Sequence, residues 1–414
     1  MFSGLSWVVI PKAIGGLHTF GLNLLAVRCL PPETFGVFNF CTTFLVLLDG
    51  LIGSAVDLGV IREASARPPD EFTPAERAGA IVKICVCLLL LPLALAFGGS
   101  VGGRPLAATA VIAGAALMVL RSVQVYFQVR QRFREFGIGE TTHLVLRCAL
   151  VSALLLAGET EPVILLAAYA LAPIGTLIQM GGRTLDLFAN LGAGIPRLHA
   201  ILGFLRDSLL ATGTGTALSR ADLLFLGLFA GKAEWGIYGA AQTIAMAPEL
   251  AASYTASALS PAIVPKVEDG TFGRFFRRFH LAAAGVALAG AAISWIVVPP
   301  LVKAVFPERY AASIPVLEPL LAGSFASALL FPVTVSFLLF YSPRTFVKFD
   351  LIAAPLLAAA YWWVAPRGGA LGVALVTAVF RVVKSAAILF AADRLAHRAP
   401  SMSAGAPSQQ DRRG

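Results

Sequence analysis

The chain has few charged side chains for its length. Only 13% of its 414 residues are Asp, Glu, Lys or Arg, whereas about a quarter of the residues in an ordinary soluble domain are charged. Apolar residues make up 57% of the chain, and its mean hydropathy is +0.80. These values argue against a water-soluble fold of this size and predict a protein that lies in a membrane.

Groups that usually carry catalysis or bind metals are also scarce. The five histidines are scattered without catalytic spacing: His18, His143, His199, His280 and His397. The five cysteines lie in or beside apolar runs, and Cys85-x-Cys87 has no further Cys or His at metal-site spacing. Because the sequence also lacks a phosphate-binding loop of the Walker type, we expect no metal, no cofactor and no ATP hydrolysis, and we predict that the protein is not an enzyme.

The N-terminus lacks the features of a removable signal peptide. It begins Met1-Phe2-Ser3 and continues into an apolar segment without a basic region or a small-residue cleavage site. We therefore expect the first helix to insert into the membrane by itself.

Long apolar runs cover almost the whole chain. A helix needs about 20 mostly apolar residues to cross a hydrocarbon core that is about 30 Å thick. We predict twelve membrane-spanning helices, over residues 5–30, 34–61, 80–98, 106–129, 141–158, 161–181, 200–230, 233–259, 279–301, 311–340, 348–365 and 368–392. The predicted fold class is thus an all-α membrane protein.

The basic residues favour one side of the predicted membrane. Nineteen Lys and Arg side chains fall in one set of alternate loops and the C-terminal tail, against six in the other set. Because cytoplasmic loops are enriched in Lys and Arg, we expect the first set and both termini to be cytoplasmic. Their placement in short loops also argues against nucleic-acid binding, in spite of the formal net charge of +9.

An internal repeat predicts two halves of six helices each. Phe35-Gly36-Val37-Phe38 matches Trp235-Gly236-Ile237-Tyr238, and a lone acid, Asp49 or Glu249, follows each glycine by thirteen residues. Two such halves have the same orientation and enclose a central cavity; chance recurrence is the alternative. We predict four parts: an N-terminal six-helix lobe (1–183), a cytoplasmic linker (184–199), a C-terminal six-helix lobe (200–392) and a disordered cytoplasmic tail (393–414).

Several motifs resemble those of a known family. In the first half they are Val27-Arg28-Cys29-Leu30-Pro31-Pro32-Glu33-Thr34-Phe35-Gly36-Val37-Phe38 and Asp57-Leu58-Gly59-Val60-Ile61-Arg62-Glu63. In the second half they are Arg220-Ala221-Asp222, Trp235-Gly236-Ile237-Tyr238-Gly239-Ala240-Ala241, Phe306-Pro307-Glu308-Arg309-Tyr310 and Gly368-Gly369-Ala370-Leu371-Gly372-Val373-Ala374. In order and spacing they resemble the polysaccharide-exporting (Wzx-type) lipid-linked oligosaccharide flippases, within the multidrug/oligosaccharidyl-lipid/polysaccharide (MATE-like) transporter superfamily. One departure is Pro31-Pro32, where the family usually has a glycine before proline.

The resemblance implies a flippase with two six-helix lobes around a central cationic cavity. Such a protein moves an undecaprenyl-pyrophosphate-linked glycan, an O-antigen or exopolysaccharide repeat unit, to the periplasmic face of the bacterial inner membrane by alternating access. The expected partners are this lipid-linked oligosaccharide, membrane lipids, a proton or sodium ion, and a glycan polymerase or other polysaccharide assembly protein.

Cations inside the predicted helices are candidates for binding the pyrophosphate, because an ionisable group in lipid costs a few kcal/mol. Arg206 and Arg220 are fourteen residues apart in the predicted helix 200–230, which places them on one face. Arg121 and Lys12 complete the predicted set. A guanidinium can hold phosphate oxygens in a fork; the alternative for each cation is that it reaches the membrane surface.

Two amides and four acids complete the predicted site. Gln124 and Gln128 share a helical stripe with Arg121, and amides can bond sugar hydroxyls. The acids either carry a coupling ion or form structural ion pairs: Asp49, Asp57, Asp222 and Glu249. Three further cations lie toward the predicted cytoplasmic ends of their helices, and we assign them mainly to the membrane surface: Arg147, Arg381 and Lys384.

Two other functions compete with a flippase. An ion-coupled multidrug exporter of the same superfamily favours a cavity of acids and aromatics, whereas this sequence offers Arg121, Arg206 and Arg220. A membrane glycan polymerase, ligase or glycosyltransferase usually needs a large external loop or a cluster of catalytic acids or histidines. The loops predicted on the outer side are short.

Overall fold

The computed structural model describes residues 2–64, 71–209, 214–252, 272–330 and 344–398. Helices make up nearly all of these residues. The N-terminal helices are α1 (Phe2–Cys29), α2 (Pro32–Leu48), α3 (Ser54–Ala64), α4 (Pro74–Val101), α5 (Arg104–Val129), α6 (Phe133–Leu156) and α7 (Pro162–Gln179). They are followed by α8 (Gly181–Ala189), a 3-10 segment (Leu191–Arg197) and α9 (Leu198–Ser208). The C-terminal helices are α10 (Thr214–Phe229), α11 (Lys232–Ala245), α13 (Phe272–Val305), α14 (Ser313–Ala328) and α16 (Arg344–Arg398).

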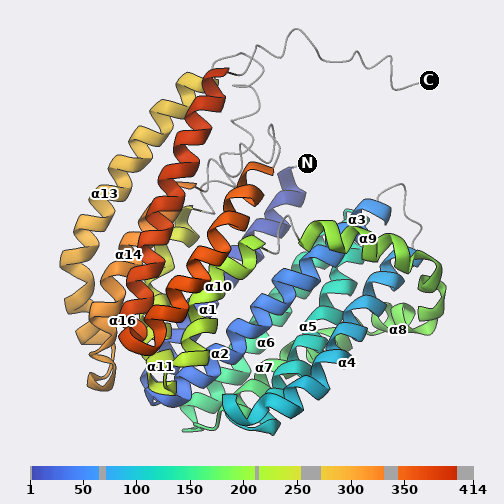
Figure 1. Cartoon of the computed structure of the whole chain (residues 1–414). Helices are drawn as coiled ribbons and strands as arrows, with labels where there is room; N and C mark the ends of the chain where they lie inside the picture. Colours follow the sequence, from blue (N-terminus) through green and yellow to red (C-terminus); the bar gives the residue numbers. More distant parts are fainter. Residues whose placement is uncertain (1, 65–70, 210–213, 253–271, 331–343, 399–414) are drawn as a thin grey trace.

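The helices form two lobes that lean together at one end. In Figure 1 the lobe of α1 to α9 lies on the right and that of α10 to α16 on the left, and the start of α1 and the end of α16 lie at the same end of the molecule. We call this the terminal end. The all-helical, two-lobe architecture predicted from the sequence is confirmed.

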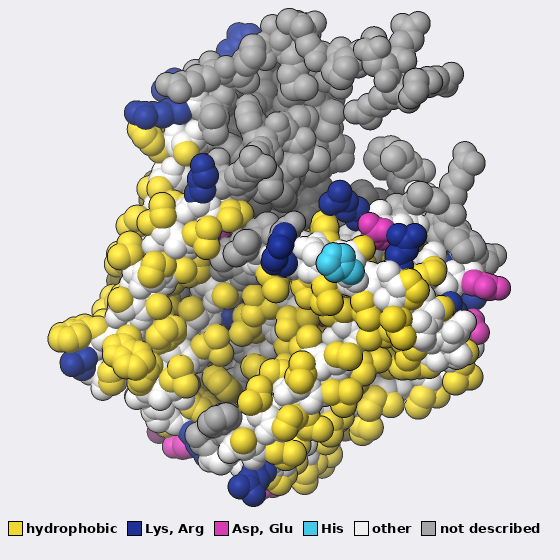
Figure 2. All heavy atoms as spheres, turned by 45° about the vertical axis from the view of Figure 1, so that its right-hand side comes forward, with side chains coloured by type: hydrophobic (Ala, Val, Ile, Leu, Met, Phe, Trp, Pro, Cys, Tyr) yellow, Lys and Arg dark blue, Asp and Glu magenta, His cyan; other side chains and the backbone are white. Residues whose placement is uncertain are grey.

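The surface is that of a multi-pass membrane protein. Seven helices in the described residues are long and apolar enough to cross a membrane. α13 shows this most clearly, because it exposes large apolar side chains such as Leu288, Ile296 and Leu301 along its length. In Figure 2 apolar side chains cover most of the visible face, while Lys and Arg gather toward the terminal end.

A π-helical turn interrupts the second predicted span. Residues Asp49–Gly53 form this turn between α2 and α3, and π turns inside α-helices are often found at functional sites. A Cβ atom on Gly53 would lie 2.6 Å from Oδ1 of Asp49. Glycine at this position therefore leaves room for the carboxylate.

The seventh predicted span is described as two helices, α9 and α10, that pack against different neighbours. α9 contacts α3 and α4, whereas α10 contacts α16 and α2. Arg206 lies on α9 and Arg220 on α10, so the two arginines do not share one helix face. The predicted linker 184–199 is largely helical, through α8 and the 3-10 segment.

α16 contains two predicted spans. Its helices join at a kink where Gly369 has a φ of 52°, and the carboxylate of Glu234 accepts a 2.6 Å hydrogen bond from the backbone N–H of Ala370. Helix continues to Arg398, into the segment 393–414 that was predicted to be disordered. Residues 399–414 of that segment lie outside the described residues.

The lobes meet closely at the end opposite the termini. α2 crosses α11 there, and buried aromatic rings such as Phe35, Trp235 and Tyr310 surround the crossing. The Tyr310 hydroxyl donates to the Leu30 carbonyl oxygen at 3.0 Å, and the guanidinium of Arg309 donates to the Arg28 carbonyl oxygen at 2.6 Å. Close contact through small residues and hydrogen bonds is how helices associate in lipid.

A buried ion pair stabilises the N-terminal lobe near the terminal end. Thr73 and Glu76 form a capping box at the start of α4. Glu76 also accepts a 2.6 Å hydrogen bond from Arg130, whose guanidinium stacks 3.7 Å above the ring of Tyr126. The charged side chains are only 2% and 4% exposed, so this pair joins α4 to the end of α5.

Candidate functional site

Two adjoining hollows lie between the lobes, with volumes of about 110 and 370 Å³. Side chains of α1, α2, α6, α7, α10 and α11 line the smaller one, and α1, α5, α6 and α11 contribute to the larger one. Both hollows are lined by Thr19, Asn23, Arg147, Thr243 and Met246. We refer to the two together as the inter-lobe cavity.

Arg147 is the cation that lines both hollows. It lies on α6 and donates hydrogen bonds to the Thr19 hydroxyl at 2.7 Å and the Tyr169 hydroxyl at 2.9 Å. Its buried Nε atom has no hydrogen-bond partner, and it forms no ion pair with any described residue. The guanidinium is therefore held in place by neutral groups, and its charge is not balanced by a neighbouring carboxylate.

Arg220 faces the same smaller hollow from the other lobe. It lies on α10, and within the described parts of the chain it forms neither a hydrogen bond nor an ion pair. The inter-lobe cavity thus has two guanidinium groups, Arg147 and Arg220, one from each lobe, that have no acidic partner among the described residues. An anion in the smaller hollow would face an arginine from each lobe.

Arg121 lines the larger hollow, but carboxylates surround it. It donates to Glu140 at 2.6 Å and lies 3.7 Å from Asp49. Gln124 accepts from Arg121 at 2.6 Å and donates to Glu140 at 2.9 Å. The predicted polar stripe on α5 is therefore partly occupied by Glu140, while Gln128, one turn further on, is exposed.

Most of the other predicted acids form ion pairs inside a lobe. Asp57 pairs with the buried Lys83 at 2.6 Å, and Glu249 pairs with Arg381 at 2.7 Å. Lys384 pairs with Asp350. Arg381 and Lys384 therefore contact acids of their own lobe, where the sequence interpretation assigned them to the membrane surface.

Asp222 is different because it is buried without a cation among its hydrogen-bond partners. It is 1% exposed and accepts hydrogen bonds from the Tyr238 hydroxyl at 2.6 Å, the backbone N–H of Leu223 at 2.8 Å and the side-chain amide of Gln242 at 3.4 Å. Thr377 connects the hydroxyls of Tyr238 and Tyr361. This network joins α10, α11 and both helices of α16.

Two predicted cations are not seen in the cavity. Arg206 is exposed on α9 and is not among the residues that line either hollow. Lys12 lies in α1, but its side chain is outside the described residues.

The cavity also has uncharged polar side chains that the sequence analysis did not single out. Thr19 and Asn23 come from α1, and Gln242 and Thr243 from α11. A single Asn or Thr in an apolar helix gives no distinctive pattern, so only the spatial convergence of α1 and α11 identifies them.

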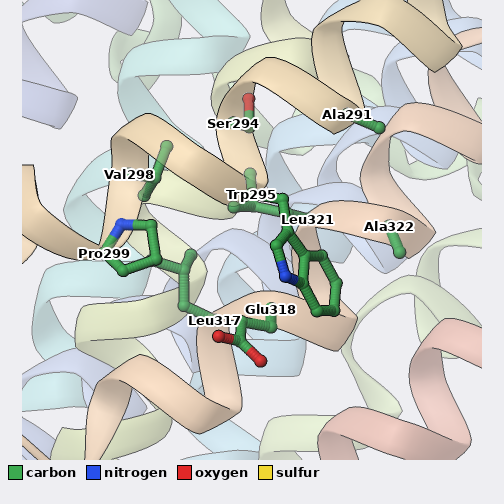
Figure 3. Close-up of a pocket in the computed structure, with 9 residues that line it drawn as sticks. All are labelled: Ala291, Ser294, Trp295, Val298, Pro299, Leu317, Glu318, Leu321 and Ala322. Atoms are coloured by element: carbon green, nitrogen blue, oxygen red, sulfur yellow. The ribbon is translucent and has the colours of Figure 1, made fainter.

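A separate hollow between α13 and α14 has a different character. Figure 3 shows its lining, which includes Trp295, Val298, Pro299 and Leu321 together with the single acid Glu318. No cation lines it, so a phosphate group would find no partner there. Within the described residues there is also no cluster of His, Cys, Asp and Glu suited to a metal ion.

The sequence and fold were compared with known proteins. A family model described as polysaccharide biosynthesis protein matches residues 3–265, and no curated protein sequence matches. The solved structures that are similar include the lipid II flippase MurJ in an inward closed conformation, with a TM-score of 0.68, 11% identity, and coverage of 92% of this chain and 86% of that chain.

Multidrug transporters share the fold as well. An inward-facing multidrug resistance MATE family transporter of the MOP superfamily gives a TM-score of 0.59 at 14% identity, covering 95% of this chain and 98% of that one. The Vibrio cholerae MATE transporter VcmN in the bent form gives 0.53 at 15% identity, covering 96% and 97%. At such identities the likeness concerns the fold.

Proposed function

This chain belongs to the polysaccharide biosynthesis protein family, and we propose that it is a Wzx-type flippase for a polyprenyl-pyrophosphate-linked oligosaccharide. It moves an O-antigen or exopolysaccharide repeat unit from the cytoplasmic to the periplasmic leaflet of the bacterial inner membrane. The glycan is carried without covalent change, so the protein is a transporter and not an enzyme.

The observation that carries this proposal is the pair Arg147 and Arg220. Both line the smaller hollow, they come from different lobes, and neither has an acidic partner in the described residues. Guanidinium groups form charge-assisted, often bidentate hydrogen bonds with phosphate oxygens. A pyrophosphate between the lobes would supply the negative charge that these side chains lack.

The remaining lining suits the sugar part of the substrate. Hydroxyl and amide groups of Thr19, Asn23, Gln242 and Thr243 border the cations, and such groups can both donate to and accept from sugar hydroxyls. The polyprenyl tail would stay in the lipid, because the face shown in Figure 2 is largely apolar and α13 exposes large apolar side chains.

Alternating access follows from where the lobes are closed. Contacts between Tyr310 and Leu30 and between Arg309 and Arg28 close the end opposite the termini. The excess of Lys and Arg in the loops of the terminal end orients that end toward the cytoplasm. We therefore interpret this structure as a state closed to the periplasm, with both termini cytoplasmic.

One observation favours an ion-coupled multidrug exporter as the second candidate. The buried Asp222, whose hydrogen-bond partners among the described residues are Tyr238, Leu223 and Gln242, is a place where a proton or another coupling ion could bind. Arg147 and Arg220, which have no acidic partner among the described residues, favour an anionic cargo over a cationic drug.

A transport assay tests the proposal. The full chain is reconstituted in vesicles with a lipid-linked oligosaccharide, and a glycan-modifying enzyme added outside measures its appearance in the outer leaflet. We expect Arg147→Ala and Arg220→Ala each to slow transport about tenfold or more, since a hydrogen bond to a charged group contributes about 1.5–3 kcal/mol.

Arg104→Ala is the matched control. Arg104 is exposed at the opposite end of the N-terminal lobe and lines neither hollow, so this variant should transport at the rate of the unchanged protein. Transport that neither Arg147→Ala nor Arg220→Ala slows would contradict the proposed function. Vesicles that move a cationic drug and no lipid-linked glycan would contradict it as well.

A further inference from the structure

Arg121 differs from the other cavity arginines because two carboxylates hold it. The ion pair with Glu140 is 2.6 Å long and the approach to Asp49 is 3.7 Å. Both Arg121 and Glu140 line the larger hollow. A ligand in that hollow can therefore reach the guanidinium only in competition with the carboxylate that already occupies it.

Asp49 has features that a simple structural ion pair does not need. It begins the π-helical turn Asp49–Gly53, and its buried Oδ1 atom has no hydrogen-bond partner. Only the other carboxylate oxygen approaches Arg121. The cluster of Asp49, Arg121 and Glu140 thus contains one cation and two acids.

The charged neighbours do not remove this excess of acid. Lys83 of α4 lies near Asp49, but it is paired with Asp57 of α3. On α6, His143 lies near Glu140 and Arg147. The other ionisable residues on the neighbouring helices include Arg220 and Asp222 of α10, Lys12 and His18 of α1, and Tyr169 of α7.

We propose that Glu140 and Asp49 stand in for the substrate's pyrophosphate in the empty cavity, and that the substrate displaces them from Arg121 with the uptake of one proton. This inference rests on the proposed function. The pyrophosphate oxygens take over the hydrogen bonds of Arg121, and a carboxylate that has lost its partner in a buried site is far more stable as the neutral acid. The proton comes from the bulk solution, as hydronium or a protonated buffer, and binds to a carboxylate oxygen.

The proposal has a direct consequence for binding. The ligand-bound protein holds one proton more than the empty protein, so a lower pH favours the bound state and the affinity rises as the pH falls. When no substrate is bound, Glu140 and Asp49 balance the positive charge of Arg121. The two lobes can then return to the cytoplasm-facing state without an unpaired arginine at this position.

The variant Glu140→Gln separates this role from a purely structural one. The amide keeps a similar shape but no longer competes as an anion for Arg121, so we expect the ligand to bind at least threefold more tightly and with less proton uptake. A structural ion pair predicts the reverse, because breaking it would leave Arg121 misplaced and weaken binding. Asp49→Asn should likewise make the ligand bind more tightly.

Calorimetry on the full chain in detergent provides the test. The probe is a short-chain prenyl pyrophosphoryl N-acetylglucosamine, a pyrophosphate diester that does not titrate between about pH 6 and about pH 8. Titrations in buffers of different ionisation enthalpy measure the protons taken up. We expect close to one proton taken up per bound ligand for the unchanged protein and clearly less than one for Glu140→Gln. The control Glu318→Gln, in the separate hollow of Figure 3, should behave as the unchanged protein.

The outcomes distinguish the two proposals. Binding without proton uptake, or a Glu140→Gln variant that folds but binds more weakly, would overturn this inference and leave the proposed function intact. If Glu140→Gln does not fold, the same comparison applies to Asp49→Asn. A probe that does not bind the unchanged protein at all would overturn both.

Discussion

Gly36 of α2 and Gly236 of α11 touch each other across the two lobes. A Cβ atom on Gly36 would lie 2.6 Å from the backbone nitrogen of Gly236, and one on Gly236 would overlap the backbone of Pro32. These are the glycines of the two repeated motifs. The repeat thus places its two copies face to face, where the lobes close the end opposite the termini.

Gly36→Val should hinder this closure. Real Cβ atoms essentially never come within 3.0 Å of backbone, so the lobes would have to separate at this end. We expect the variant to be expressed and folded but to transport at least tenfold more slowly. Double electron–electron resonance between two spin labels, one on each lobe near this end, should give a longer label-to-label distance than in the unchanged protein.

Gly21→Ala on α1 is the control for that experiment, because an added Cβ there would meet nothing within 4 Å. It should leave both the distance and the transport rate unchanged. An unchanged distance in Gly36→Val would show that the crossing of α2 and α11 does not close the cavity.

The buried pair of Arg130 and Glu76 should contribute strongly to stability. Removing one partner of a buried ion pair leaves an uncompensated charge and costs about 3–5 kcal/mol. We expect Arg130→Ala to lower the unfolding temperature of the purified protein clearly. Arg197→Ala, whose exposed pair with Glu63 is 3.8 Å long, should have a small effect, and equal shifts in the two variants would argue against this ranking.

The hydroxyl of Tyr238 should contribute more to the free energy of unfolding than the hydroxyl of Tyr361. Tyr238→Phe removes a 2.6 Å hydrogen bond to the buried carboxylate of Asp222, and a hydrogen bond to a charged group contributes about 1.5–3 kcal/mol. Tyr361→Phe removes a bond to the neutral Thr377 hydroxyl, for which about 0.5–1.5 kcal/mol is typical. Denaturant unfolding of both variants measures the difference, and a larger loss in Tyr361→Phe would contradict this assignment.

Asn23 should recognise the glycan and not the pyrophosphate. It lines both hollows beside Arg147 and forms no hydrogen bond with a described residue. We expect Asn23→Leu to weaken the binding of a prenyl pyrophosphoryl oligosaccharide severalfold while the binding of the matching prenyl pyrophosphate changes little. An equal loss for both ligands would place Asn23 at the pyrophosphate.

The helices themselves were predictable from hydropathy, because a membrane helix must be apolar over about 20 residues. α5 (Arg104–Val129) begins and ends within two residues of the predicted span 106–129. The glycine motifs also located the starts of α2 and α11. Hydropathy alone could not show that residues 200–230 contain two helices, since both α9 and α10 are apolar.

The depth of Arg147 was misjudged for a similar reason. Its helix was predicted to begin at residue 141, but α6 begins at Phe133. Arg147 is therefore fourteen residues into the helix, or about 21 Å at 1.5 Å per residue. That places it at the cavity and away from the membrane surface to which the sequence analysis assigned it.

The partners of the charged groups could not be predicted either. Glu140 and Arg121 are nineteen residues apart on different helices, and no local spacing relates them. The sequence indicated which ionisable groups lie in the predicted membrane helices. Only the arrangement of the helices shows that Arg121 pairs with an acid while Arg147 and Arg220 have none among the described residues.

The central claim is that these two arginines recognise pyrophosphate, and a cycle of protein and ligand changes tests it most directly. Affinities of the unchanged protein and of the double variant Arg147→Ala/Arg220→Ala are measured for a short-chain prenyl pyrophosphoryl sugar and for the same prenyl sugar with a neutral linker. The account predicts that the double variant loses about 100-fold or more in affinity for the pyrophosphate ligand and almost nothing for the neutral one. Equal losses for both ligands would contradict it.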